Sequence, residues 1–315
     1  MSRPVFVVPL DGSELAERAL PYAVRLAAAR GGQLALIRVA LGPPPSGFDW
    51  ERQQVAVVDE AEAYLSRVAD TLAVDRLPIQ TVVPYGHAAA QIVKVTQELG
   101  AAEVVMATHG RTGLPHLLYG SVAEAVLARS RIPVLLVPAR PGEAPMPPFD
   151  PIAPRMVVAL DGSAFAEAAL PVAREMVGPG GELILLRVEP PPDRVLRDTT
   201  GKVVAYLDQL EAGFRREATN YLDRVVGQLK RDAPGLRVSV FVRVGEPAQG
   251  IVLAAADRSA DLVVMATHGR TGLRRAVLGS VAGEVVRSGA TPVLLVHPSS
   301  PSGSEQEEAT LAATV

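Results

Sequence analysis

The chain has 315 residues and no cysteine, which excludes disulfides, thiolate metal sites and cysteine nucleophiles. The absence of cysteine also fits a reducing compartment. Aromatic residues make up only 4% of the chain, so the core has to be built from Val, Leu, Ile and Ala. Together these absences point to an aliphatic core that is held together without covalent cross-links.

Excess basic charge and long apolar runs are also missing. The net charge of −3 argues against a nucleic-acid partner. No window reaches the roughly 18 uninterrupted apolar residues of a membrane span. The first residues run almost directly into a strand-like segment, with no separate apolar signal region and no small-residue cleavage site. We therefore expect a cytoplasmic protein with no membrane association.

The pattern that is present alternates short apolar runs with longer amphipathic segments. In the first 140 residues, strands are expected near 5–10, 34–39, 79–85, 103–107 and 133–137. Helices are expected between them, including one over about 13–30 that begins after Ser13 and is kinked by Pro21. Several of the strands are apolar without a period of two, which is typical of a parallel sheet covered on both faces. The fold class is therefore α/β, with a doubly wound sheet.

The second half of the chain repeats this order. Asp161-Gly162-Ser163 repeats Asp11-Gly12-Ser13 at an offset of 161 − 11 = 150, whereas His268 repeats His109 at 268 − 109 = 159. About ten extra residues therefore enter between the second and third strands of the second half, and we expect them to lengthen its loop and long helix over 193–232. A repeat of this length indicates a tandem duplication of a whole domain.

The domain boundaries follow from this repeat and from composition. We expect one domain over 1–140 and a second over 155–298. The Pro-rich stretch 141–154 between them is typical of a stiff linker. The polar, partly acidic tail 299–315 is expected to be disordered.

One motif occurs in both halves. The first copy runs from Ala107 to Leu114 as Ala-Thr-His-Gly-Arg-Thr-Gly-Leu and closes with Gly120-Ser121-Val122. The second runs from Ala266 to Leu273 and closes with Gly279-Ser280-Val281. Each copy follows an apolar run and leads into a helical segment. A strand, a glycine-containing loop and a helix N-terminus form an anion site, because free N–H groups and the positive end of the helix dipole collect there. We expect each copy to hold the phosphates of a nucleotide.

The strand order 3-2-1-4-5 would place this loop beside other polar groups. Strands 1 and 4 are then neighbours where the order reverses, and ligands bind at the carboxyl ends of the strands at such a point. Asp11 follows strand 1 and Val39 follows strand 2, so both would border the same crevice as the loop. Asp11 could accept a hydrogen bond from a ribose hydroxyl or face a cation.

Within the loop, residue type suggests the roles. Gly110 and Gly120 allow the backbone to approach phosphate closely, and Arg111 could fold over the phosphates. Ser121 adds a hydroxyl at the start of the helix. His109 could donate to a phosphate or brace the loop. The alternative is that each Gly-Ser is only a turn followed by a helix cap, because duplication copies a turn as readily as a site.

Other chemistry is not indicated. His87, His116 and His297 have no partners in the repeat, and no metal-ligand spacing appears, so we expect no metal site. Neither a P-loop nor the Gly-x-Gly-x2-Gly pattern occurs, and there is no Gly-x-Ser-x-Gly elbow. No activated nucleophile or matched acid–base pair is evident, so no catalytic residue is predicted.

On these residues the chain resembles a tandem universal stress protein over about 3–138 and 155–297. The nucleotide-binding branch of that family carries Gly-x2-Gly-x9-Gly-[Ser/Thr]. Here the second glycine is Gly110, the spacer is 111–119 and the end is Gly120-Ser121. The second half gives Gly269, 270–278 and Gly279-Ser280. Ala107 and Ala266 stand where the family has its first glycine.

The resemblance implies two five-stranded, Rossmann-like sheets of the adenine nucleotide alpha hydrolase-like type, with strand order 3-2-1-4-5. It implies ATP or a related adenine nucleotide as ligand, with or without Mg²⁺. It also implies that the fifth strands, 134–137 and 293–296, meet in an intramolecular pseudo-dimer, to which a homodimer could be added. The family's adenosine contacts would fall on Pro9, Leu10, Asp11 and Val39, and on Ala159, Leu160, Asp161 and Val188.

The complete predicted site combines these contacts with the two copies of the motif. From the motif it takes Ala107, His109, Gly110, Arg111, Gly120, Ser121 and Val122, and Ala266, His268, Gly269, Arg270, Gly279, Ser280 and Val281. The leading hypothesis is a nucleotide-binding module in stress response or signalling. Two alternatives are a nucleotide-free interaction scaffold, in which the two alanines mark a lost site, and a slow ATP hydrolase that depends on Asp11 and Asp161.

Overall fold

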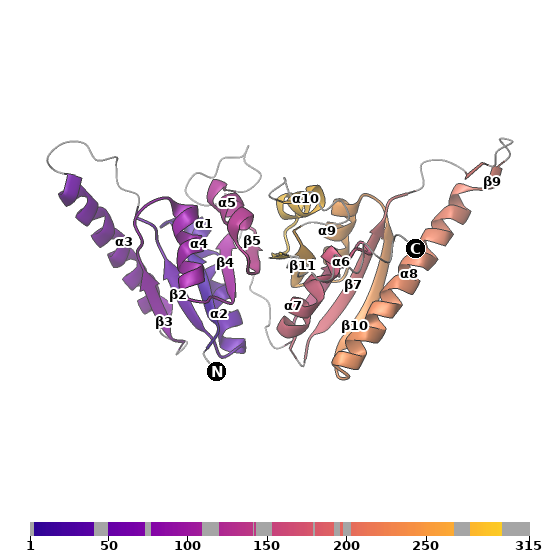
Figure 1. Cartoon of the computed structure of the whole chain (residues 1–315), viewed down its shortest axis with the longest axis horizontal. Helices are drawn as coiled ribbons and strands as arrows, with labels where there is room; N and C mark the ends of the chain where they lie inside the picture. The colour runs from indigo at the N-terminus through magenta and orange to yellow at the C-terminus, as the bar shows by residue number, and fades with distance from the viewer. Residues whose placement is uncertain are drawn as a thin grey trace, which may run out of the picture.

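The computed structural model describes residues 3–40, 50–72, 77–108, 120–140, 142, 153–178, 180–191, 196–197, 203–267 and 278–297. We refer to residues 3–140 as the first half and to residues 153–297 as the second half. Figure 1 shows the two halves side by side, with their long helices on the two outer flanks. The predicted linker lies outside the described residues apart from Gly142 and residues 153–154, and the predicted tail lies outside them entirely.

The first half alternates strands and helices in the order that the sequence predicts. Its elements are β1 (Val5–Pro9), α1 (Glu14–Glu17), α2 (Leu20–Ala29), β2 (Gln33–Ile37), α3 (Trp50–Leu72), β3 (Ile79–Val82), α4 (Ala88–Glu98), β4 (Glu103–Ala107), α5 (Ser121–Arg129) and β5 (Val134–Val137).

The second half repeats this series and adds a short hairpin. Its elements are β6 (Arg155–Ala159), α6 (Ala164–Glu167), α7 (Ala169–Met176), β7 (Glu182–Glu189), β8 (Leu196–Arg197), β9 (Val203–Ala205), α8 (Leu207–Asp232), β10 (Arg237–Val244), α9 (Pro247–Asp257), β11 (Leu262–Ala266), α10 (Ser280–Ser288) and β12 (Val293–Val296).

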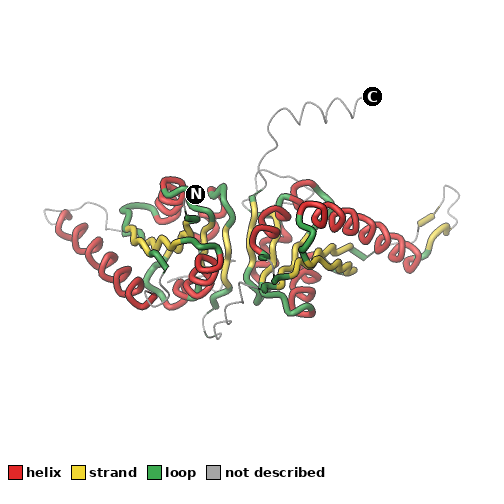
Figure 2. Tube along the Cα trace, turned by 90° about the horizontal axis from the view of Figure 1, so that it is seen from below, coloured by secondary structure: helices red, strands yellow, loops and turns green. Residues whose placement is uncertain are grey.

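A single ten-stranded sheet runs through both halves. Its strand order is β10-β7-β6-β11-β12-β5-β4-β1-β2-β3, so each half contributes five strands with its third strand at the outer edge and its fifth at the centre. Within this sheet, neighbouring strands of the same half are parallel. At the centre, β5 and β12 pair antiparallel, with Leu135 opposite Leu294, and Figure 2 shows these two strands side by side.

Helices cover both faces of the sheet, because the strand residues that point to either face are apolar. In β1, Phe6 and Val8 belong to a core cluster with α2 and α3, whereas Val5 and Val7 belong to a second cluster with α4 and α5. Each cluster continues across the centre into the second half. The α/β, doubly wound fold class is therefore confirmed.

One local expectation was wrong, and another was incomplete. The single kinked helix over 13–30 is two helices, α1 and α2. Ser13 caps α1 by accepting a hydrogen bond from the Ala16 amide, and Pro21 lies in the first turn of α2, where a missing N–H costs little. In the second half, the extra residues lengthen α8 to 26 residues from the 23 of α3, but they also form the β8–β9 hairpin, which was not predicted.

Candidate functional site

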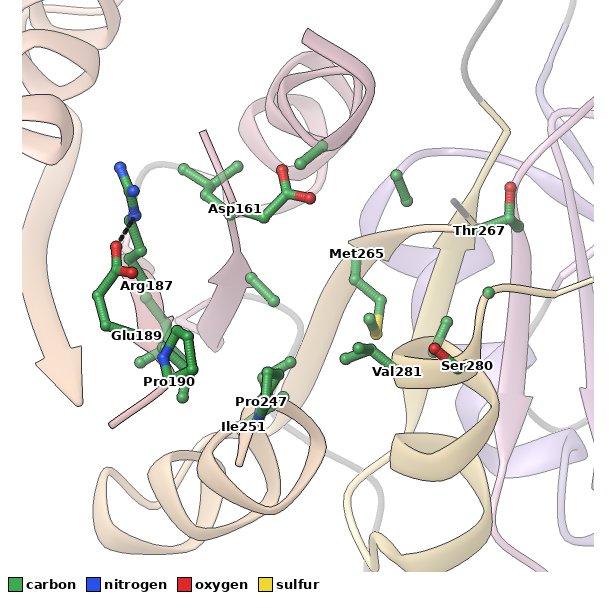
Figure 3. Close-up of a pocket in the computed structure, with 18 residues that line it drawn as sticks. Asp161, Arg187, Glu189, Pro190, Pro247, Ile251, Met265, Thr267, Ser280 and Val281 are labelled. Atoms are coloured by element: carbon green, nitrogen blue, oxygen red, sulfur yellow. Dashed lines mark ion pairs between the residues drawn. The ribbon is translucent and has the colours of Figure 1, made fainter. Parts of the chain in front are cut away.

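A cavity of about 480 Å³ opens in the first half where the strand order reverses, between β1 and β4. Its walls come from the carboxyl ends of β1, β2 and β4, from α3 and α4, and from the first turn of α5. The second half has a corresponding cavity of about 330 Å³ (Figure 3). Both volumes lie within the range of about 300–1,000 Å³ that is usual for small-molecule sites.

Every predicted site residue that the structure describes lines one of these two cavities. In the first half these are Pro9, Leu10, Asp11, Val39, Ala107, Gly120, Ser121 and Val122. In the second half they are Ala159, Leu160, Asp161, Val188, Ala266, Gly279, Ser280 and Val281. The other six, His109, Gly110, Arg111, His268, Gly269 and Arg270, lie outside the described residues.

A helix N-terminus points its amides at each cavity. Gly120 is the N-cap of α5, and its own amide donates to the Thr108 carbonyl at 2.7 Å. Gly279 does the same at α10, donating to the Thr267 carbonyl at 2.8 Å. A glycine cap has no side chain that could accept from the following amides, so the first-turn N–H groups remain available to an anion. The helix dipole adds positive potential at the same place.

An aspartate lies on the other side of each cavity. Oδ1 of Asp11 accepts from the Ser13 amide at 3.0 Å and from the Ser13 hydroxyl at 2.6 Å. Asp161 makes the same two bonds with Ser163, at 2.9 Å and 2.6 Å. These bonds fix the carboxylate against its own loop. In Figure 3, Asp161 and Ser280 lie on opposite sides of the second-half cavity.

Sequence reasoning missed an arginine–tyrosine–glutamate group that supports the wall of each cavity. The Arg38 guanidinium stacks 4.7 Å from the centre of the Tyr64 ring, and the Tyr64 hydroxyl donates to Glu17 at 2.8 Å. Burial, together with this bond to Glu17, raises the pKa of the Tyr64 hydroxyl. The tyrosine therefore stays neutral and remains a donor.

The second half repeats this group with Arg187, Tyr221 and Glu167. The guanidinium lies 5.2 Å from the ring centre, and the hydroxyl donates to Glu167 at 2.9 Å. Burial and the bond to Glu167 raise the pKa of Tyr221 as well. The repeated Arg-Val pair at the end of the second strand was the signal in the sequence, but its partners on the long helix become visible only in three dimensions.

The described residues provide neither a metal cluster nor a membrane-spanning helix. In that part of the chain, His, Asp and Glu side chains do not gather in a group of three or more that could hold a metal ion. None of the helices described there combines the length and the apolar character that a membrane span needs.

Comparison with known proteins gives consistent matches. The sequence model of the Universal stress protein family matches residues 3–138 and 153–297. A universal stress protein of Mycobacterium tuberculosis is 28% identical over 301 residues, which cover 93% of this chain and 97% of that protein. A universal stress protein of Methanocaldococcus jannaschii is 32% identical over 136 residues, covering 42% of this chain and 79% of the relative.

Among solved structures, a universal stress protein from Archaeoglobus fulgidus superposes with a TM-score of 0.68 at 22% identity, covering 96% of this chain and 98% of that one. At this identity the likeness concerns the fold. It extends over both halves and therefore includes the way in which they are joined.

Proposed function

The chain belongs to the universal stress protein family, and from this premise we propose that each half binds ATP or a related adenine nucleotide in its cavity. Nucleotide binding would make the protein a stress-response or signalling module. The observation that carries the proposal is the pairing, in both cavities, of an open helix N-terminus with an aspartate on the opposite wall. A turn with a simple helix cap would not require that pairing.

The phosphates would lie at the first turn of α5 or α10. The amides of Ser121 and Val122, and of Ser280 and Val281, would donate to phosphate oxygens, and the serine hydroxyls add a second kind of donor. The alanines at 107 and 266 close the ends of β4 and β11 and still leave a cavity in front of each helix. This geometry supports a retained site rather than a lost one.

The nucleoside would lie toward the ends of the first two strands. There the walls are mainly apolar, with Leu10, Ile37 and Val39 in the first half, which suits the faces of a purine. Asp11 would accept from a ribose hydroxyl, as acidic residues do in related nucleotide folds. A magnesium ion would enter with the triphosphate, since Mg²⁺ is commonly held by phosphates plus one or two carboxylates.

Isothermal titration calorimetry with ATP and Mg²⁺ tests the proposal. The wild-type protein should bind, and the double variant Gly120→Leu, Gly279→Leu should bind at least about tenfold more weakly because a bulky side chain stands in front of the amides. Both glycines have negative φ angles, so leucine fits the backbone. Gly213→Ala is the control, because this glycine lies on α8 with open space around it. Absence of any binding at millimolar nucleotide would exclude the proposal.

A further inference from the structure

We propose that the two cavities bind adenine nucleotide unequally: the first-half cavity is the high-affinity site, and Glu189 weakens the second. The inference rests on the nucleotide binding proposed above and concerns which of the two cavities binds the nucleotide more tightly. It starts from the difference in volume, about 480 Å³ against about 330 Å³, between two sites that share the same predicted residue positions.

Arg38 and Arg187, the equivalent arginines at the end of the second strand of each half, form ion pairs with different partners. Arg38 pairs with Glu60 on α3 at 2.9 Å, and the Glu60 side chain is 69% exposed. Arg187 pairs at 2.5 Å with Glu189, two residues along its own strand, and the Glu189 side chain is 11% exposed. The pair in the second half is therefore withdrawn from solvent and stands inside the cavity wall, where Figure 3 shows it with its dashed line.

The residue equivalent to Glu189 in the first half is Ala40, since 189 − 40 equals the offset of 149 between Arg187 and Arg38. Ala40 lines the larger cavity, together with Val57 and Glu60 of α3. Among its described lining residues, the second-half cavity has none from α8. The carboxylate of Glu189 and its arginine thus take the space that in the first half extends to the long helix.

The opposite wall is closer as well. Pro247 at the start of α9 stands where the first half has Ala88. One turn further, Gly250 lets α9 approach β7 so closely that a Cβ at that position would lie 2.6 Å from Cγ1 of Val188. The first half has Gln91 there. A missing side chain at such a contact indicates close approach of helix and strand, which narrows the crevice.

A nucleotide that fits the first-half cavity would therefore have to displace Glu189 in the second. Separating a pair that is nearly buried leaves an uncompensated charge, which is costly. We expect the second site to bind ATP about tenfold more weakly or worse. Glu189 acts here as a specificity-determining residue and has no part in phosphate binding.

The test replaces each of Glu189 and Ala40 by the residue found at the equivalent position of the other half. Calorimetry with Mg²⁺ then measures how many ATP molecules bind per chain, and how tightly. Wild type should show one tight equivalent and a second at least about tenfold weaker. Glu189→Ala should tighten the second, and Ala40→Glu should weaken the first. Measurements in the Gly120→Leu background isolate the second site. Glu189→Gln keeps the side-chain shape and should tighten binding less than alanine, and Glu217→Ala, which changes the exposed α8 counterpart of Glu60, should change nothing.

Two tight, equal equivalents in the wild type would overturn the inference and leave the proposed function intact. The inference would also be overturned if Glu189→Ala, shown by circular dichroism to be folded, left the ATP affinity of the second site unchanged. No bound ATP in any form of the protein would overturn both proposals. A single titration series distinguishes these outcomes.

Discussion

At the level of single residues, Glu103 is a carboxylate buried at the start of a strand. It begins β4, is 1% exposed, and stands where the second half has Leu262. Its Oε2 lies 3.6 Å from Nη1 of Arg30, whereas Oε1 has no hydrogen-bond partner among the described residues. Burial raises the pKa of Glu103 to about 8, although Arg30 opposes the shift.

This pKa predicts how stability depends on pH. Because the folded pKa exceeds the unfolded value of 4.5, the folded chain holds a proton that the unfolded chain releases between pH 4.5 and about 8. Stability should therefore fall as the pH rises through this window, by up to about 1.4 kcal/mol per pH unit. Glu103→Leu should remove this component and stabilise the protein at pH 8. Urea unfolding from pH 5 to pH 8 measures the free energy of unfolding of the wild type and of the variant. If the two free energies changed with pH in parallel, the raised pKa would not belong to Glu103.

At the level of elements, the helical glycines show how closely each helix approaches its neighbours. Gly250 lies in α9 against Val188 of β7, with no room for a methyl group. Gly213 lies in α8 with open space around the position that a Cβ would take. Glycine therefore permits close packing in α9, whereas in α8 it only lowers the stability of the helix.

Alanine substitutions at these two positions should have opposite effects. Gly250→Ala should destabilise the protein by about 1–3 kcal/mol, because overpacking outweighs the gain in helix propensity. Gly213→Ala should stabilise it by up to about 1 kcal/mol. Chemical denaturation of the two variants beside the wild type gives both values. Equal shifts of the same sign would show that α9 is not held tightly against β7.

At the level of the whole molecule, the two halves are joined by more than the β5–β12 pairing. The Arg140 guanidinium donates to the carbonyls of Arg287 and Gly289, at 2.6 Å and 3.0 Å. Arg30 of the first half pairs with Glu175 of the second. The first contact satisfies carbonyls at the end of α10, where the helix dipole favours a cation.

Arg140→Ala should loosen this junction. Loss of charge-assisted bonds to backbone carbonyls should cost about 1.5–3 kcal/mol. The effect should appear as faster hydrogen exchange in residues 134–137 and 293–296, with the outer strands unchanged. Arg174→Ala is the control, because its pair with Asp232 is exposed and worth only about 0–1 kcal/mol. Unaltered exchange at the central strands would show that Arg140 does not help to hold the halves together.

Local pattern was enough to predict the elements near the site. Apolar runs predicted β1 and β4, and the Gly-Ser pairs placed the starts of α5 and α10 correctly. Pro21 was misjudged because the same residue either kinks a helix or begins one, and the choice depends on where the preceding turn packs. The β8–β9 hairpin was missed because its two short strands give too little periodicity to recognise.

By itself, the sequence determined the duplication, the alternation of strands and helices, and the position of a Gly-Ser pair at the start of a helix in each half, because these depend on spacing along the chain. The partner of each arginine was decided only by the tertiary structure. Arg38 reaches Glu60 on a helix, whereas Arg187 reaches Glu189 along its own strand. The sequence offers Arg187 two carboxylates, Glu189 and the counterpart of Glu60 at Glu217, and does not indicate which of them it pairs with. Side-chain pairing and cavity volume depend on how closely distant elements approach, and no local pattern records that distance.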